Sequence, residues 1–118
     1  MSKREVVVVG AARTAIGTFG GSLKDVPMTV LGATVVKAAL ERAGVQGGDI
    51  GHVVMGNVIP TEPKDAYLSR VSAMDAGIPK EVPAFNVNRL CGSGLQAVVC
   101  AAQSILLGDA DLAVGGGA

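Results

Sequence analysis

The sequence lacks the features that mark several classes of protein. It has no tryptophan, its only aromatic rings of the Phe and Tyr type are Phe19, Tyr67 and Phe85, and ten basic residues are balanced by ten acidic ones. A chain with no basic cluster and no aromatic platform offers nucleic acid neither an electrostatic nor a stacking surface. We therefore expect no nucleic-acid partner.

Long apolar runs are also missing. The run near the N-terminus is four valines at 6–9 flanked by charge, whereas a signal peptide needs about 7–15 apolar residues and a membrane span about 18–20. Two cysteines without a secretion signal indicate free thiols in a reducing cytosol. The sequence thus predicts a cytoplasmic protein without a membrane segment.

Glycine is abundant, with 17 residues lying mostly between apolar segments, as tight turns require. The first segment, REVVVVGA at 4–11, is β-branched throughout, which is typical of a strand buried on both faces. A glycine-rich loop follows, and strand-like segments then alternate with helix-like ones. We expect strands at 4–11, 51–60, 83–88 and 111–118, and helices at 29–44, 66–77 and 91–107. This alternation predicts one α/β domain with a mostly parallel sheet.

The stretch NRLCGSGLQAVVCAAQSILLG, residues 88–108, has no charge between Arg89 and Asp109. A helix that is apolar nearly all round must be covered on most sides, and one small sheet covers only one. Cys91 lies at the expected helix start, where unpaired N–H groups stabilise a thiolate. Gly92 and Gly94 leave room for a substrate and for backbone N–H groups facing an oxyanion. On this chemistry alone, a nucleophile and a buried structural thiol are equally good interpretations of Cys91.

Three other residues favour structural roles. Cys100 follows Cys91 by nine residues, about 13 Å of helical rise, on the opposite helix face, and a disulfide needs Cα atoms within roughly 7 Å. We therefore expect no disulfide between them and interpret Cys100 as a small core residue. The single histidine, His52, is expected to be an ordinary structural residue, and Arg13 is expected to tie the glycine-rich loop to backbone carbonyls or a carboxylate.

The motif NRLCGSGLQA at 88–97 resembles the nucleophile segment of the thiolases, the acetyl-CoA acetyltransferases and β-ketothiolases. Three further segments resemble this family in its own order: ARTAIGTFGGSL at 12–23, VVMGNVIPTE at 53–62 and ILLGDADLAVGGGA at 105–118. The likeness therefore covers the whole chain, and it is closest to the bacterial biosynthetic type. It implies a thiolase-like fold, with this chain as the N-terminal part of one α/β half of an α-β-α-β-α layered architecture.

The resemblance also implies an activity. The cysteine matching Cys91 takes an acyl group from acyl-CoA, and a deprotonated acetyl-CoA then attacks it. Two acetyl-CoA molecules give acetoacetyl-CoA, acetyl-CoA plus a longer acyl-CoA gives a 3-ketoacyl-CoA, and thiolysis reverses both. Coenzyme A thioesters are substrates here, and no cofactor or metal is expected. Strand 83–88 would pair with its copy in a homo-oligomer, a dimer or a tetramer.

The likeness covers only part of such an enzyme. The family segments with the activating histidine, the oxyanion-hole groups and the second cysteine do not occur in these 118 residues. We therefore expect residues 1–118 to be a partial thiolase N-terminal domain, inactive and poorly stable alone, whose remainder is a second polypeptide. The alternatives are a decarboxylating enzyme like β-ketoacyl synthase and a non-catalytic fragment or assembly subunit. A further alternative, a nucleotide-binding α/β module, is supported only by the weak glycine patterns in VVVVGAARTAIG and LAVGGGA.

Overall fold

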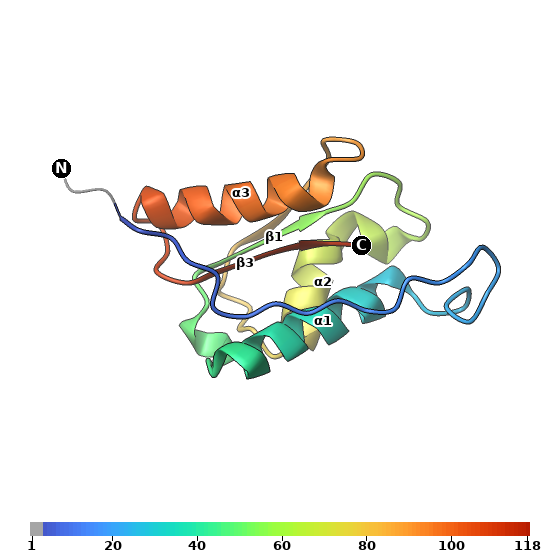
Figure 1. Ribbon diagram of the computed structural model, residues 1–118, viewed down its shortest axis with the longest axis horizontal. Coiled ribbons are helices and arrows are strands. Elements are labelled where there is room, and N and C mark those ends of the chain that lie inside the picture. The colour runs from blue at the N-terminus through green and yellow to red at the C-terminus, as the bar shows by residue number, and fades with distance from the viewer. Residues whose placement is uncertain (1–3) are drawn as a thin grey trace.

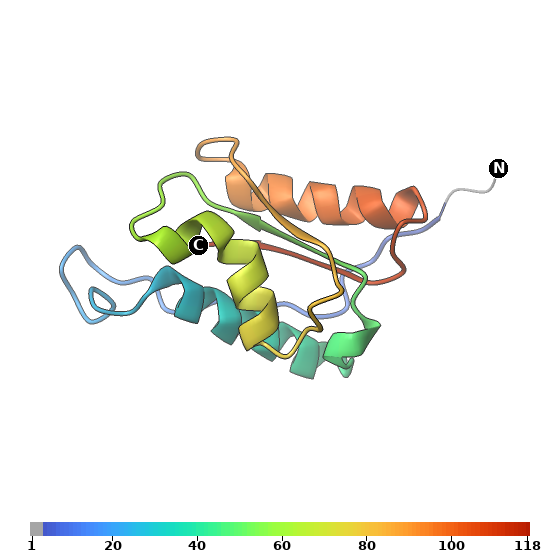
Figure 2. The same cartoon turned by 180° about the vertical axis from the view of Figure 1, so that it is seen from behind.

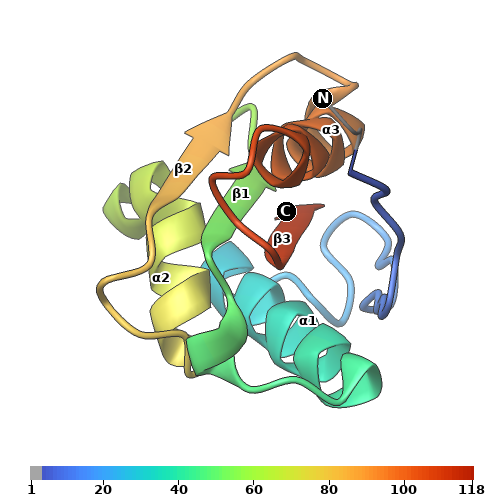
Figure 3. The ribbon, with the colours of Figure 1, turned by 90° about the vertical axis from the view of Figure 1, so that its left-hand side faces the viewer.

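The computed structural model describes residues 4–118 as three layers. Helix α3 covers one face of a three-stranded sheet, and helices α1 and α2 cover the other (Figures 1 and 3). In chain order the elements are α1 (Met28–Ala43), the short 3-10 helix η1 (Gly47–Asp49), β1 (His52–Gly56), the 3-10 helix η2 (Pro63–Tyr67), α2 (Leu68–Asp75), β2 (Ala84–Val87), α3 (Ser93–Leu106) and β3 (Ala113–Gly117).

The sheet has the order β2-β1-β3, and both pairings are parallel. The central strand β1 is buried on both faces from Val53 to Gly56, as its continuous apolar run predicts. The strand is shorter than the expected 51–60, because its partners in β2 and β3 extend only as far as Gly56. The predicted parallel α/β sheet is thus confirmed.

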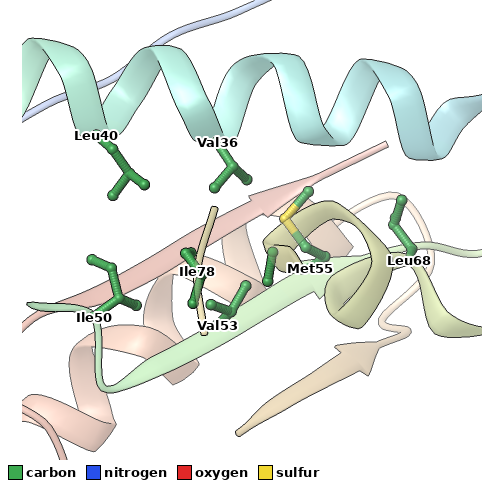
Figure 4. Close-up of a cluster of buried hydrophobic side chains, with 8 residues drawn as sticks. Val36, Leu40, Ile50, Val53, Met55, Leu68 and Ile78 are labelled. Carbon is green, nitrogen blue, oxygen red and sulfur yellow. The ribbon is translucent and has the colours of Figure 1, made fainter. Parts of the chain in front are cut away.

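The core lies between β1 and the α1–α2 layer. Figure 4 shows the aliphatic side chains of α1 pointing toward those of β1 and α2. The buried cluster comprises Val36, Leu40, Ile50, Val53, Met55, Leu68, Ala73 and Ile78. Helix α2 packs beside α1 and against β1 and β2 (Figure 2). This layer holds β1 rigidly, so the position of its C-terminal end is well defined.

Helix boundaries follow the sequence signals closely. The helix expected at 29–44 is α1, and Gly44 ends it in the left-handed conformation with φ 69°, as a C-terminal glycine commonly does. The helix expected at 66–77 forms as η2 followed by α2, because Pro63 opens a 3-10 turn before the α-helix begins at Leu68.

The strand predicted at 4–11 is wrong for the described structure. Residues 4–18 form no helix or strand, and the three valines Val7, Val8 and Val9 are more than half exposed. Within residues 4–118, the segment 4–12 makes no backbone–backbone hydrogen bond. Side chains hold it instead: Arg4 contacts Asp111 at 2.8 Å, and Arg42 donates to the Ala11 carbonyl at 2.7 Å. A β-branched run favours an extended backbone, but a strand also needs a neighbouring edge.

Among the helices of residues 4–118, none combines the length and the apolar character needed to span a membrane.

Candidate active site

Cys91 lies in the turn that connects β2 to α3. Its side chain is exposed, and α3 begins two residues later at Ser93 with Gly92 as the N-cap. The sequence places the cysteine inside the helix start, whereas the structure places it just before the first turn. Cys91 is therefore exposed in the turn ahead of α3 and is not part of a buried core.

A cavity of about 350 Å³ opens beside the thiol. It lies where β1 and β3 end and α3 begins, and the crevice at the C-terminal ends of parallel strands is the usual ligand site of open α/β sheets. The lining residues are Gly56, Asn57, Val58, Leu90, Cys91, Ser93, Gly94, Gly117 and Ala118. The candidate nucleophile Cys91 thus borders a cavity of the expected kind. Its side chain is exposed, which does not fit the alternative interpretation of a buried structural thiol.

The start of α3 touches the end of β1 directly. A Cβ added at Gly56 would lie 2.5 Å from the carbonyl carbon of Ser93 and 2.7 Å from the nitrogen of Gly94. Only glycine allows this approach, so Gly56 fixes the first turn of α3 against the sheet. Ser93 itself is 4 % exposed. The position of Cys91 therefore depends on a backbone contact between β1 and α3.

The loop after β1 forms another wall of the cavity. The Asn57 amide donates to the carbonyl of Ala118 at 3.0 Å, which joins the ends of β1 and β3. Farther along this loop, Asp65 is fully buried. Its Oδ2 accepts from the Thr61 hydroxyl and the Thr61 N–H, both at 2.7 Å, and from the Glu62 N–H at 2.9 Å.

These contacts decide the charge state of the buried carboxyl group. The hydrogen bond from the Thr61 hydroxyl lowers the pKa of Asp65 below its ordinary value; burial acts in the opposite direction, and the backbone N–H groups of Thr61 and Glu62 add to the lowering. An ionised Asp65 therefore organises the loop from which Val58 and Asn57 reach the cavity.

The remaining candidates take structural positions, although Cys100, expected to be a small core residue, is not part of the buried core. Both cysteines are free, and Cys100 is half-buried with the Gln96 amide 3.5 Å from its sulfur. Arg13 donates to the backbone carbonyl of Thr14 at 3.0 Å. His52 opens β1 with its ring 5.3 Å from that of Phe85. Four residues of strand, about 13 Å, separate His52 from the cavity end of β1, so this imidazole is not the base that activates Cys91.

Helix α3 packs on the sheet through the face that carries its small side chains. Its buried residues are Ser93, Ala97, Ala101 and Ser104. The large apolar side chains of Leu95, Val98, Val99, Leu106 and Leu107 are exposed instead. The sheet covers one side of this helix, as expected, and the side that it covers carries the small residues.

The sequence singles out Cys91 as the candidate nucleophile but gives no comparable indication of Gly56, Asn57 or Ser93. A weak signal existed for Gly56, since a glycine ends an otherwise β-branched strand in VVMG. No local pattern, however, indicates which helix the end of a strand will contact.

Within residues 4–118, no group of three or more His, Cys, Asp or Glu side chains is placed to hold a metal ion.

Comparisons with known proteins agree with this geometry. Residues 6–118 match the family model described as the N-terminal domain of thiolase. The chain is 68 % identical over 115 residues to the β-ketothiolase BktB of Cupriavidus necator, covering 98 % of this chain and 29 % of that protein. It is 51 % identical over 113 residues to an acetyl-CoA acetyltransferase of the same organism, covering 96 % and 28 %.

Solved structures give the same result. A Bacillus anthracis acetyl-CoA acetyltransferase superimposes with a TM-score of 0.91 at 36 % identity, over 98 % of this chain and 29 % of that one. A human mitochondrial 3-ketoacyl-CoA thiolase in complex with CoA superimposes with a TM-score of 0.85 at 44 % identity, over 87 % and 26 %. The chain therefore spans less than a third of the length of these relatives.

Proposed function

Because the chain belongs to the thiolase family, we propose that residues 1–118 are the part of a thiolase that supplies its nucleophile, Cys91. The activity is acyl transfer between coenzyme A thioesters. The observation that carries this proposal is the placement of Cys91: an exposed thiol, just ahead of a helix N-terminus, beside a cavity at the ends of two parallel strands. The names of the relatives, which include acetyl-CoA acetyltransferases and a thiolase in complex with CoA, support the substrate class.

The first half of the reaction acylates the cysteine. The Cys91 thiolate attacks the carbonyl carbon of acyl-CoA, a new carbon–sulfur bond forms, and the tetrahedral intermediate expels coenzyme A, which takes up a proton. The small residues at this edge leave space for the thioester, and Cys91 precedes the positive end of the α3 dipole, which favours negative charge there. Coenzyme A is a substrate in this scheme, and neither a resident cofactor nor a metal takes part.

The second half forms the carbon–carbon bond. A base removes the α-proton of a second acetyl-CoA, the resulting carbanion attacks the acyl carbon, and Cys91 leaves as a thiolate. The products are acetoacetyl-CoA or a longer 3-ketoacyl-CoA, and thiolysis runs the same steps backward. The described residues offer no histidine near the thiol, so the base belongs to the remainder of the thiolase chain.

That remainder is the principal partner in this proposal. Residues 1–118 would be a partial N-terminal domain within a larger α-β-α-β-α enzyme, with the rest of the chain covering α3. The edge strand β2 is suited to pair with its copy in a homo-oligomer. The two free thiols fit a cytoplasmic enzyme.

The test is to incubate the full-length protein that contains these residues with acetyl-CoA and to digest it for mass spectrometry. An acetyl group on Cys91, lost in Cys91→Ser and kept in Cys100→Ser, is the expected result, together with thiolysis of acetoacetyl-CoA. Cys100 is the matched control because it is the other free thiol of the same segment.

Two results would overturn the proposal. Turnover of malonyl thioesters with loss of carbon dioxide, without condensation of two acetyl-CoA molecules, would identify a decarboxylating condensing enzyme. An unmodified Cys91 together with no turnover of either substrate would identify a non-catalytic assembly subunit.

A further inference from the structure

The turn that carries Cys91 holds an unusual backbone conformation. Leu90 has φ 51°, and it is the one residue other than glycine with a positive φ between positions 4 and 118. A residue other than glycine is strained in this region, so the conformation persists only where the surroundings enforce it. The Leu90 side chain is 69 % exposed, and its packing therefore does not enforce it.

Polar contacts on both sides of Leu90 hold this conformation instead. The Ser93 hydroxyl accepts from the N–H of Arg89 at 2.8 Å and donates to the carbonyl of Leu90 at 2.6 Å. The Asn88 side chain accepts from the N–H of Leu90 at 2.9 Å. Ser93 is 4 % exposed, so water does not readily replace its hydroxyl, and one buried oxygen links the N–H of Arg89 to the carbonyl of Leu90 and so spans both residues.

Cys91 follows Leu90 directly, and its direction depends on this bridge. Two overlapping turns close around it: the Gly92 N–H donates to the Arg89 carbonyl at 3.1 Å, and the Ser93 N–H donates to the Leu90 carbonyl at 3.0 Å. If Leu90 relaxed to a negative φ, the Cα–Cβ bond of Cys91 would rotate away from the cavity and from the N-terminus of α3.

We infer that Ser93 is a positioning residue for Cys91. Its buried hydroxyl keeps Leu90 left-handed and thereby aims the thiol into the cavity. The inference rests on the proposed function, because it assigns to Ser93 a share in acylation of Cys91. It also concerns the geometry of the thiol itself, which can be measured without turnover.

Ser104 provides a matched control on the same helix. It is also a buried serine, 8 % exposed, and its hydroxyl donates to a carbonyl three residues earlier, that of Ala101, at 2.7 Å. It lies at the opposite end of α3 from Cys91. Loss of a hydroxyl there removes a similar hydrogen bond without affecting the turn at Leu90.

The experiment compares Ser93→Ala and Ser104→Ala in the full-length protein containing residues 1–118. In Ser93→Ala we expect kcat for acetoacetyl-CoA thiolysis to fall by roughly tenfold to a hundredfold, since a misplacement of about 1 Å costs about that much, while KM changes little. Alkylation of Cys91 by iodoacetamide at neutral pH should also slow, because the turn no longer holds the thiol exposed beside the cavity. Ser104→Ala should match the wild type in both rates.

The double variant Leu90→Gly, Ser93→Ala tests whether Ser93 acts on Cys91 through the backbone conformation of Leu90. Glycine adopts a positive φ without strain, so this variant should be alkylated faster than Ser93→Ala alone. Equal rates in the two would overturn the role given to Leu90. Wild-type kcat and alkylation in Ser93→Ala, or an equal loss in Ser104→Ala, would overturn the positioning role. A wild-type protein without thiolysis would overturn the proposed function instead, and the alkylation rates would still decide the role of Ser93.

Discussion

At the scale of single residues, Gly56 shows how a missing side chain can fix the geometry of the turn that carries Cys91. Replacing it with alanine would place a methyl group 2.5 Å from the backbone of Ser93, so β1 and α3 must separate. We expect Gly56→Ala to lower the free energy of unfolding by about 1–3 kcal/mol, the usual cost of overpacking, and to slow alkylation of Cys91. Denaturant unfolding and thiol labelling measure the two effects.

A second glycine serves as the control for this variant. A Cβ at Gly48 meets no atom within 4 Å, so Gly48→Ala should change stability by no more than about 0.5 kcal/mol. If both substitutions changed the free energy of unfolding by the same small amount, the close contact between β1 and α3 would not be what fixes the position of α3.

Asp65 gives the protein a pH-dependent stability at the same scale. Its hydrogen bond from the Thr61 hydroxyl, with those from the Thr61 and Glu62 N–H groups, lowers its pKa in the folded protein. A carboxyl group whose pKa is lower in the folded than in the unfolded protein stabilises the fold at pH values above its unfolded-state pKa. This stabilisation is lost as the pH falls through its folded-state pKa. We expect the unfolding midpoint to fall on acidification below about pH 4, and to fall less steeply in Asp65→Asn.

The exposed carboxylate of Asp75 on α2 provides the comparison. Asp75→Asn should retain the wild-type slope of stability against pH in this range, because the Asp75 side chain is exposed and the substitution leaves the hydrogen bonds to Asp65 in place. An Asp65→Asn variant with an unchanged slope would show that other groups cause the acid sensitivity.

At the scale of elements, the two faces of α3 differ: the face with small residues is buried on the sheet, and the face with large apolar residues is exposed. Leu95 is 73 % exposed on the outer face. Under the proposed function, the rest of the thiolase chain covers this face. We expect Leu95→Gln to reduce self-association of the isolated 118-residue chain, because it removes part of an exposed apolar patch. In the full-length enzyme the same change should lower the free energy of unfolding by about 2 kcal/mol, the value of burying a leucine.

Val30 on α1 is the control for this comparison, since it too is an exposed apolar residue, at 49 %, but belongs to the opposite layer. Val30→Gln should leave self-association and full-length stability close to wild type. Sedimentation of the short chain and denaturant unfolding of the full-length protein measure the two quantities. A Leu95→Gln enzyme as stable as wild type would mean that nothing covers the outer face.

The sequence predicts the elements of this fold better than their partners. Helical spacing and a terminal glycine locate α1, and the apolar run locates β1. The same reasoning singles out Cys91 as a candidate nucleophile, because a thiol before Gly-Ser-Gly at a helix start suits that chemistry, although it suits a structural role as well. It cannot find Ser93 or Gly56, because their roles depend on contacts across a turn and between two elements. It also fails at 4–11, where the β-branched pattern is present and the pairing edge is not.

At the scale of the whole molecule, that failed strand lies beside a second cavity. The N-terminal segment passes β3 on the side away from β1 (Figure 3). Between them lies a cavity of about 470 Å³, bordered by Val8 and Gly10 on one side, by β3 on the other, and by α1 beneath. Two extended backbones with unpaired hydrogen-bonding groups thus face each other across an apolar space. An exposed strand edge with unpaired N–H and C=O groups is a template for pairing with another strand.

We therefore expect an added strand to fill this cavity in the full-length enzyme and to pair with both β3 and segment 4–11. Hydrogen exchange at the amides of Val6 to Val9 measures this pairing. Exchange should be fast in the isolated chain and slower by roughly two orders of magnitude or more in the full-length protein, since ladder hydrogen bonds open only through larger unfolding events. The Val53 amide, already bonded to the Pro83 carbonyl, should be protected in both whenever the core is folded. Equal, fast exchange of the valines in both proteins would show that the segment stays unpaired, and that its β-branched run has another purpose.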